Sequence, residues 1–508
     1  LAMAIAFYAL YQYFTGTNRV WGFVSPYKNR ASGTYISPNH LAGFLEMILP
    51  LGLAFTLTSR LKAPMRILAG YASLVILAGI AVTVSRGAWI STTLTIIVFF
   101  LVLLFHKKHR LPAIIVLSVL AVGAIVIIPK AMTLRLRFDR MLASHELNQN
   151  LRYSLWEPAW QMWRENPVWG VGPGHFDSLF RAYRPEDVQL QPDWVHNDYL
   201  NTLTDWGVTG TVIVLAAWVL LAIGAAQTFH AVRPQSSDLS LTGGSNKFAF
   251  TLGAALGLLA ILFHSFVDFN MHIPANAILC VSLMALLASH LRFASTRYWF
   301  SAGIATKVVC TLALVGGSGY LAAQAWVRGA EAIQLRRANA QSNFSPEQAA
   351  DLKAAFRVDP RNPATAYRIG EAYRIQSFEG GENYQELGEE ALKWFKKTTE
   401  LDPWNGYGYL RYGMCLDWLG RKEESGAWFD KASRLDPNGY YSVAYIGLHH
   451  VQLGNYAAAI PWFERSLRLR SDANTIARSY LEICTTRLLE TATNKNNLLM
   501  LAKPVRSE

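Results

Sequence analysis

The sequence predicts an all-α protein, with a polytopic transmembrane helical bundle and a large external loop followed by a soluble α-solenoid. Apolar runs long enough to cross a bilayer fill its first two-thirds, and paired helical segments repeat after about residue 330. With 52% hydrophobic and 16% charged residues, the chain of 508 residues is too apolar for a soluble protein and too polar for membrane spans alone. We expect a membrane domain at 1–327 and a repeat domain at 328–508.

The expected spans are continuous apolar segments with few charges. They lie at about 39–59, 67–85, 88–105, 111–128, 206–226, 248–268, 276–291 and 307–326. A further apolar stretch at 1–14 is too short to span. We interpret it as the end of a helix that begins in a preceding segment, so that the sequence would be a fragment with more spans before it.

Charge in the connections predicts the orientation. The connections 60–66, 107–110, 227–247 and 291–307 are rich in Lys and Arg, whereas the short connections of the opposite side hold only Arg19, Lys28, Arg30 and Arg86. By the positive-inside rule, the first group is cytoplasmic. Loop 129–205 and the repeats are then periplasmic, in a protein of the bacterial inner membrane. Because these anchors supply most of the net charge of +12, that charge does not predict nucleic-acid binding.

The segment after residue 330 contains a repeat. Leu401, Leu435 and Leu469 follow one another at 34-residue intervals, near the motifs ELDP, RLDP and LRLRS. A helix–turn–helix unit of this length resembles the tetratricopeptide repeat, whose stacked copies form a solenoid with a concave face. We interpret the array as a scaffold that offers a site to a protein partner. The aromatic residues Trp404, Tyr407 and Trp418 either pack the repeats or line a partner groove.

Two arginines stand out on the predicted external side. Arg86, in TVSRGAWIS, lies between two spans, where it is either a functional cation or an anchor that reaches the lipid headgroups. Arg152 begins an amphipathic pattern suited to a helix on the surface of the membrane lipid. The G-V-G-P-G turn that follows resembles a nucleotide-binding loop only superficially, because no strand precedes it.

The stretch QPDWVHNDYLNTLTDWGVTG lies just before a span. If it is helical, His196 shares a side with Tyr199, and Asn197 and Asp205 belong to an adjacent polar stripe. His196 is either a structural histidine or a catalytic base. Asp193, His196 and Asp198 are alternatively metal ligands, although no second histidine has suitable spacing, and we expect neither a metal nor another cofactor.

These motifs together resemble the O-antigen ligase and polymerase superfamily, polytopic enzymes that move glycans from undecaprenyl-pyrophosphate to an acceptor. The resemblance rests on SRGA, on R-x-x-x-W-x-x-A with P-x-x-G-x-G-x-G-x-F, and on H-N-x-Y-L with G-x-x-G. It implies that Arg86 and Arg152 bind the lipid pyrophosphate and that His196 is the base. Asp205 departs from the family, in which Glu is common at this position, and its role is open.

The chemistry of such a transfer agrees with these residue types. A departing diphosphate needs positive charge, which guanidinium supplies at any relevant pH in a forked geometry. Imidazole titrates near neutrality and suits the deprotonation of a hydroxyl. We count Asn197, Tyr199 and Asp205 among the substrate-binding candidates, with the tyrosine ring as a flat face for a sugar.

Other residues of the region are lesser candidates. Arg181 and Arg184 either hold glycan or phosphate or pair with the neighbouring acids Glu186 and Asp187. His264, Asp268 and His272 either line the cavity or cap helices. The acceptor is a lipid, a glycan chain or a protein side chain, the last making the chain a protein O-oligosaccharyltransferase. A transporter and a membrane-anchored scaffold are the alternatives of another class, but no duplicated span pattern favours transport.

Overall fold

The computed structural model describes residues 1–105, 110–111, 113–118, 121–122, 147–232, 245–297, 299 and 301–501, with the backbone alone for 147–151 and 491–501. This described part is helical except for one two-stranded antiparallel hairpin. Its packing forms two compact units, which are residues 1–176 with 193–300, and residues 177–192 with 301–508. Each unit is described by itself.

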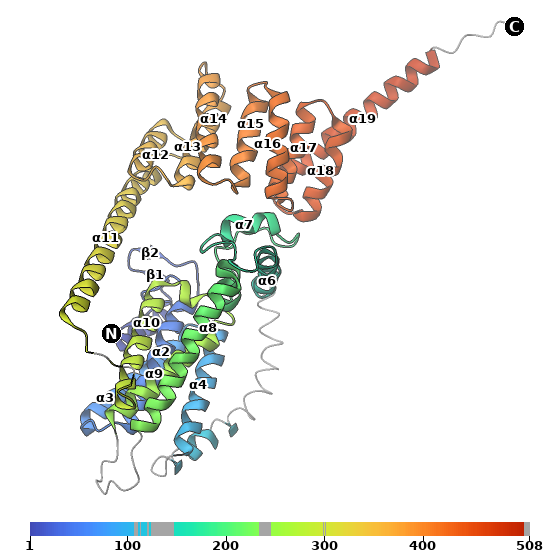
Figure 1. Ribbon diagram of the computed structural model, residues 1–508. Coiled ribbons are helices and arrows are strands. Elements are labelled where there is room, and N and C mark those ends of the chain that lie inside the picture. Colours follow the sequence, from blue (N-terminus) through green and yellow to red (C-terminus); the bar gives the residue numbers. More distant parts are fainter. Residues whose placement is uncertain are drawn as a thin grey trace, which may run out of the picture. The chain divides into compact units, whose positions relative to one another are not determined.

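The first unit is a helical bundle with the hairpin between its first two helices along the chain (Figure 1). Its elements are α1 (Ala2–Thr15), β1 (Arg19–Val20), β2 (Phe23–Val24), α2 (Pro38–Thr58), α3 (Ala63–Val82), α4 (Arg86–Leu104), α6 (Leu147–Glu165), α8 (Asp198–Val232), α9 (Asn246–His264), η1 (Asn270–His272), α10 (Pro274–Ser289) and η2 (His290–Phe293).

The prediction of an all-helical, multi-pass membrane protein is confirmed. Within the described residues, seven helical segments are long and apolar enough to cross a bilayer, namely α2, α3, α4, α8, α9, α10 with η2, and α11 (Ile304–Ala340). The expected span at 111–128 lies mostly outside the described residues. The stretch at 1–14 corresponds to α1, which has 14 residues.

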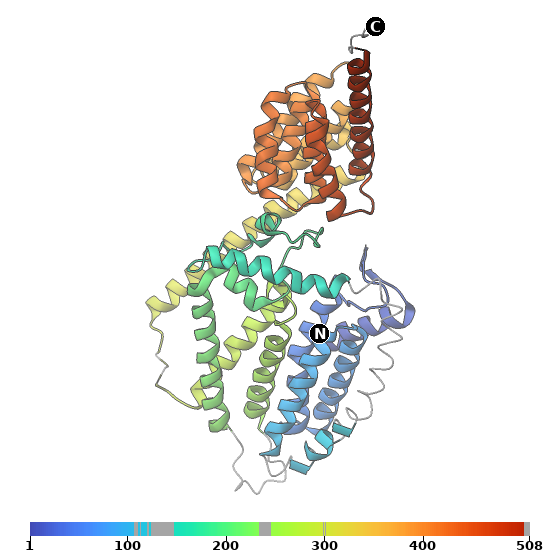
Figure 2. The same cartoon turned by 90° about the vertical axis from the view of Figure 1, so that its right-hand side faces the viewer.

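Different connections between helices meet at the two ends of the bundle. At one end, the Ser245 amide donates to Thr58 O over 2.8 Å. At the other end, the Ala31 amide donates to Val82 O over 3.0 Å. The helices run side by side between these ends (Figure 2). The short connections that the charge pattern separates therefore lie at opposite ends, as a polytopic bundle requires.

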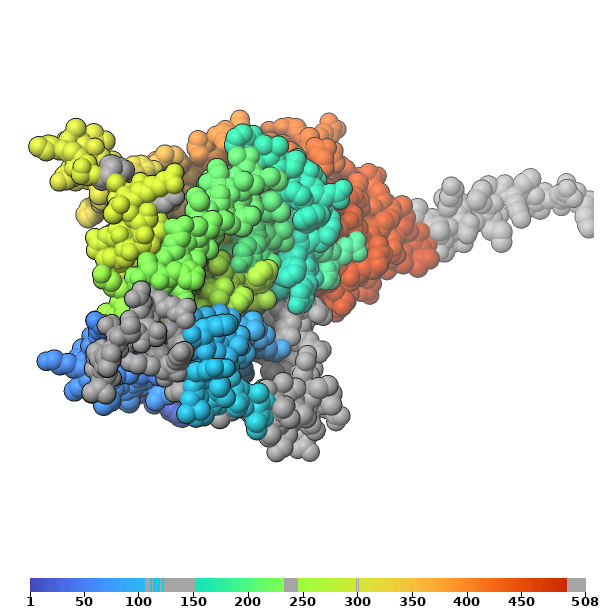
Figure 3. Space-filling view, turned by 60° about the horizontal axis from the view of Figure 1, so that its bottom comes forward, coloured from blue at the N-terminus to red at the C-terminus, as the bar shows by residue number. Residues whose placement is uncertain are grey.

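An apolar cavity of about 770 Å³ opens on the surface of the bundle. Side chains of α8 and α9 form most of its wall, together with Val102 of α4, the adjacent Phe105 and Leu287 of α10. Figure 3 shows α4 and α8 on the face seen from this direction. Such a wall is stable against lipid chains and would be costly to expose to water.

The second unit is a series of paired helices. Its helices are α7 (Phe176–Tyr183, all but its first residue), α11, α12 (Pro346–Val358), α13 (Pro363–Phe378), α14 (Tyr384–Leu401), α15 (Gly406–Trp418), α16 (Lys422–Leu435), α17 (Tyr440–Gln452), α18 (Tyr456–Leu469) and α19 (Thr475–Leu501). Helix α11 runs without interruption through the expected domain boundary at 327, and the units divide at residues 300 and 301 instead.

The repeat period has a packing cause. A Cβ on Gly413 of α15 would lie 2.9 Å from the ring of Phe429 in α16, and one on Gly447 of α17 would lie 2.9 Å from that of Phe463 in α18. Each first helix therefore approaches its partner so closely that only glycine fits opposite the phenylalanine. This unit of one glycine and one phenylalanine recurs after 34 residues.

Candidate functional site

Asp268 is the centre of a polar cluster at the hairpin end of the bundle. It lies between α9 and η1 and is 1% exposed. Its Oδ2 accepts a hydrogen bond from Asn39 Nδ2 over 2.7 Å and lies 3.7 Å from Arg152 Nη2. Its Oδ1 accepts from the Phe269 amide and lies 3.7 Å from His196 Nδ1. Two of the predicted site residues, Arg152 and His196, thus meet at one carboxylate.

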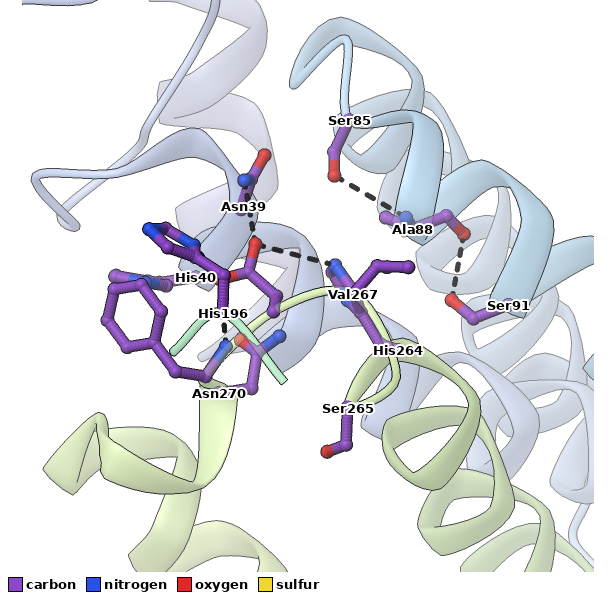
Figure 4. Close-up of polar contacts among 12 residues, drawn as sticks. Asn39, His40, Ser85, Ala88, Ser91, His196, His264, Ser265, Val267 and Asn270 are labelled. Atoms are coloured by element: carbon purple, nitrogen blue, oxygen red, sulfur yellow. Dashed lines mark hydrogen bonds and ion pairs between the residues drawn. The ribbon is translucent and has the colours of Figure 1, made fainter. Parts of the chain in front are cut away.

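His196 reaches this cluster from a strained backbone position. Helix α8 begins at Asp198, so the expectation that His196 is helical is wrong. Its φ is 57°, a left-handed conformation that costs energy in a residue with a side chain. The ring meets the edge of Phe269 with a centroid distance of 4.7 Å, and the His196 side chain is 30% exposed. Figure 4 shows His196 in the same region as Asn39 and His264. His196 therefore has one buried nitrogen toward Asp268 and an otherwise accessible ring.

Asn197 and Asp198 hold the chain in this conformation. The Asn197 carboxamide oxygen accepts from the amides of Tyr199 and Leu200 over 3.0 Å and so caps α8. The Asp198 carboxylate accepts from Ser265 Oγ over 2.8 Å and lies 2.9 Å from His272 Nδ1. These contacts fix His196 from its C-terminal side.

Tyr199 and Asp205 contact neighbouring backbone and amide groups. Tyr199 Oη donates to Leu262 O over 2.8 Å, and Asp205 Oδ2 accepts from Asn201 Nδ2 over 2.9 Å. The Asp205 carbonyl accepts from the Gly172 amide over 3.0 Å, so the glycine-rich turn packs against α8. The contacts of Tyr199 and of the Asp205 carbonyl join α8 to its neighbours, whereas the contact with Asn201 lies within α8.

Arg152 and Arg30 bring positive charge to the same end of the bundle. Arg152 Nη1 donates to Val267 O over 2.7 Å. Arg30 Nε donates to Thr83 O over 2.9 Å, and its Nη2 donates to Asn39 Oδ1 over 2.7 Å. From sequence alone, Arg30 is only one of the charges of a short connection, because its contacts with Thr83 and Asn39 depend on the tertiary structure.

The charges in this cluster act on one another. Burial lowers the pKa of Arg30, and the positive charges of Arg152 and Arg86 lower it further, against the opposing effect of Tyr27 and Asp268. Burial alone would raise the pKa of Asp268, but the approach of His196 and the positive charges of His264 and Arg152 outweigh burial and hold that pKa well below its ordinary value. Asp268 is therefore an anion at neutral pH.

Arg86 begins α4 and is exposed. The preceding Ser85 caps the helix through its side chain, which accepts from the Ala88 amide. The next residue, Gly87, packs so closely that a Cβ would lie 2.8 Å from Val267 Cγ2 and 3.1 Å from His264. The motif SRGA thus places the N-terminus of α4, the positive end of its helix dipole, beside the connection that carries Asp268.

A buried ion pair between His264 and Glu46 lies next to the cluster and contacts Asp268. His264 Nδ1 lies 2.6 Å from Glu46 Oε1, and Ser91 Oγ donates to Glu46 Oε2 over 2.5 Å. The opposite nitrogen, His264 Nε2, lies 4.0 Å from Asp268 Oδ2. Both His264 and Glu46 are 1% exposed. The chain of groups from Glu46 through His264 to Asp268 fixes the carboxylate that faces His196.

The two remaining predicted arginines, Arg181 and Arg184, belong to the second unit. Arg184 Nε lies 3.4 Å from Asp436 Oδ1, and the Arg181 guanidinium lies 3.8 Å from the centre of the Tyr407 ring. Within the described residues, no three or more His, Cys, Asp or Glu side chains are grouped as they would be to hold a metal ion, the region of Asp193 included.

Comparison with known families agrees with the motifs and the helices. The family model described as O-Antigen ligase matches residues 71–215, and the tetratricopeptide repeat model matches 407–438 and 446–472. The chain carries an O-antigen ligase domain and C-terminal tetratricopeptide repeats. Curated proteins gave no match. The protein is thus a multi-pass membrane protein that carries a domain similar to the O-antigen ligase family.

The matched segment of the O-antigen ligase domain contains only part of the cluster. Arg86, Arg152 and His196 lie inside it, whereas Arg30, Asn39 and Asp268 lie outside. Segments on both sides of the matched region therefore complete the arrangement that the ligase motifs begin.

Proposed function

We propose that the O-antigen ligase domain moves a glycan from an undecaprenyl-pyrophosphate carrier to an acceptor hydroxyl, on the periplasmic side of the bacterial inner membrane. The observation that carries the proposal is the meeting of Arg152 and His196 at the buried Asp268. Cations for a departing anion and a base for an incoming alcohol are the two requirements of this reaction.

Arginines supply the positive charge that the diphosphate needs. In this proposal Arg86 and Arg152 hold the diphosphate, and Arg30 adds a third guanidinium within electrostatic range of both. The N-terminus of α4 adds a partial positive charge. Guanidinium groups stay charged at neutral pH and bind phosphate oxygens in a forked geometry, so this reaction would need no metal ion.

His196 deprotonates the acceptor. Its Nδ1 is directed to Asp268, so the second ring nitrogen, Nε2, receives the hydroxyl proton. The acceptor oxygen then forms a bond to the anomeric carbon while the bond from that carbon to the diphosphate oxygen breaks. The diphosphate leaves on its lipid with the bonding electron pair, and Asp268 stabilises the imidazolium that forms.

The test is transfer by the purified full chain in lipid nanodiscs, with an undecaprenyl-pyrophosphate-linked glycan as donor and lipid, glycan and peptide acceptors in parallel. We expect His196→Ala to reduce the rate by roughly 10²- to 10⁴-fold while donor binding persists. His230→Ala, at the far end of α8 and exposed, is the matched control and should not change the rate. Transfer by His196→Ala at the wild-type rate would overturn the assignment of the base.

A second arm tests the source of the positive charge. Arg86→Lys and Arg152→Lys keep the charge but lose the fork, so we expect a weaker donor interaction and slower transfer. Addition of a chelator to the wild-type enzyme should not change the rate. Loss of transfer with the chelator, and its recovery with a divalent cation, would show that a metal carries the charge.

A further inference from the structure

Part of the external segment between Arg152 and His196 belongs to the repeat unit. Residues 177–192 pack with residues 301–508, although both of their ends continue into the first unit. Phe176 and Asp193 are the first residues of that unit on either side. Pro192 precedes His196 by only four residues. The proposed catalytic base is thus close, along the chain, to a segment held by the tetratricopeptide repeats.

A buried ion pair joins this segment to the turn between α16 and α17. Arg184 Nε lies 3.4 Å from Asp436 Oδ1, and the two side chains are 3% and 0% exposed. The Asp436 carboxylate also accepts from Ser442 Oγ over 2.8 Å. The guanidinium is therefore enclosed with its carboxylate, which makes it a poor ligand for a substrate, and removal of either partner would leave the other charge buried and unpaired.

The Gln189 side chain forms a second contact with the repeats, in which its amide bonds to a backbone carbonyl and to a backbone amide. Gln189 Nε2 donates to Asn438 O over 2.9 Å, and Gln189 Oε1 accepts from the Tyr440 amide over 3.1 Å. In return, Asn438 Nδ2 donates to Arg184 O over 2.7 Å. Arg181 covers the ring of Tyr407 at 3.8 Å. Side chains and backbone of both partners thus contribute, so the contact is specific.

We propose that Arg184 and Gln189 are positioning residues for the transfer, which hold the segment before His196 on the repeats and thereby keep the imidazole at Asp268. This proposal rests on the proposed function of His196. The left-handed backbone of His196 is strained and is maintained only by its surroundings. Asn197 and Asp198 restrain it on one side. On the other side, the buried Val195 donates its amide to Asn201 Oδ1 over 3.2 Å, and residues 177–192 restrain the chain before it.

The repeats then have a role in catalysis that needs no contact with substrate. Release of residues 177–192 frees the chain before His196, and small displacements of a catalytic group reduce the rate strongly. Donor binding by the arginines does not depend on this segment, so its release lowers kcat and leaves KM for the donor unchanged.

The experiment compares variants of the full chain in nanodiscs. Gln189→Ala removes two hydrogen bonds to the repeats and one to Glu186 O without exposing a charge, and Arg184→Ala removes the ion pair. The double variant Arg184→Asp with Asp436→Arg restores the pair with exchanged charges. Arg434→Ala, two residues from Asp436 and exposed, is the control. Hydrogen exchange of residues 406–469 reports whether the repeats remain folded, and exchange of residues 193–200 reports the state of the chain around His196.

We expect Gln189→Ala and Arg184→Ala to lower kcat by about tenfold to a hundredfold at unchanged donor KM, with faster exchange at residues 193–200. The charge exchange should recover most of the loss, and Arg434→Ala should behave as wild type. Gln189→Ala keeps the test decisive if Arg184→Ala unfolds the repeats. Wild-type kcat in a Gln189→Ala protein whose residues 177–192 exchange freely would overturn the inference.

The two proposals fail differently. If His196→Ala is inactive but release of residues 177–192 has no effect on kcat, only the positioning role is wrong. If His196→Ala transfers glycan at the wild-type rate, the proposed function itself is wrong.

Discussion

Replacement of Asp268 by Asn separates the effect of its charge from that of its shape. The carboxylate is buried and faces Arg152 and His196, each at 3.7 Å. Asn has the same size and still accepts a hydrogen bond from the Phe269 amide. The substitution therefore removes one negative charge from the cluster and, because an NH2 group replaces Oδ2, the hydrogen bond from Asn39 Nδ2. In the proposed reaction, that charge stabilises the imidazolium formed when His196 takes the proton of the acceptor.

The size of the effect follows from the distance. Two unit charges separated by 3.7 Å attract by about 4.5 kcal/mol at an effective dielectric constant of about 20. The imidazole is 30% exposed, and solvent screening reduces this value. A loss of about 2–4 kcal/mol in the transition state corresponds to a fall in kcat of roughly 30- to 1000-fold.

The assay is glycan transfer by the reconstituted protein, with kcat and donor KM measured separately. Removal of Asp268 also frees Arg152 from its carboxylate, so we expect donor KM to stay the same or to fall while kcat falls. This combination distinguishes loss of the carboxylate from general damage to the site, which would raise KM. An Asp268→Asn enzyme with the kcat of the wild type would refute the role of Asp268 at His196.

Three further predictions concern the same cluster. Gly87→Ala places a methyl group 2.8 Å from Val267 and should cost about 1–3 kcal/mol of stability, seen as a lower unfolding temperature, whereas Gly316→Ala, with no atom within 4 Å, should not. Arg30→Lys loses the forked contact and should raise donor KM about tenfold in the transfer assay; an unchanged KM would remove Arg30 from the donor site. Because the pKa of Asp268 lies below its ordinary value of 3.8, its stabilisation is complete above that pH and is lost as the pH falls through the folded-state value. The difference in unfolding temperature between wild type and Asp268→Asn should therefore be constant from about pH 8 to 5 and shrink below about pH 4, and a difference that grows on acidification would contradict this sign.

Much of the fold could be predicted from local sequence, because membrane spans and helical repeats are patterns within short segments. The apolar runs predict α2, α3, α4, α8 and α9, and the 34-residue period predicts the repeat helices. The start of α8 could not be predicted from the apolar span, because it depends on the Asn197 side chain, which caps the amides of Tyr199 and Leu200. The length of α11 was missed because its polar second half continues an apolar span.

The site could be predicted only where a motif is local. SRGA, Arg152 and His196 were selected by residue type and order, whereas Arg30 and Asn39 join the cluster through contacts across the sequence. The sequence leaves open whether Asp268 lines the cavity or caps a helix, because its sequence neighbours give no sign of Arg152 or His196. Arg184 was considered for substrate because Asp436 is distant in the chain. Contacts between residues so far apart in the sequence can be identified only from the tertiary structure.

The chain passes between the two units at residues 176–177, 192–193 and 300–301. The repeats are consequently not a detachable tail. A truncated protein that ends near residue 300 would leave Arg184 and Gln189 without their partners, and its inactivity would say nothing about acceptor recognition. An exchange of repeats between related proteins would therefore have to include residues 177–192, although this segment is separated from the repeats in the sequence.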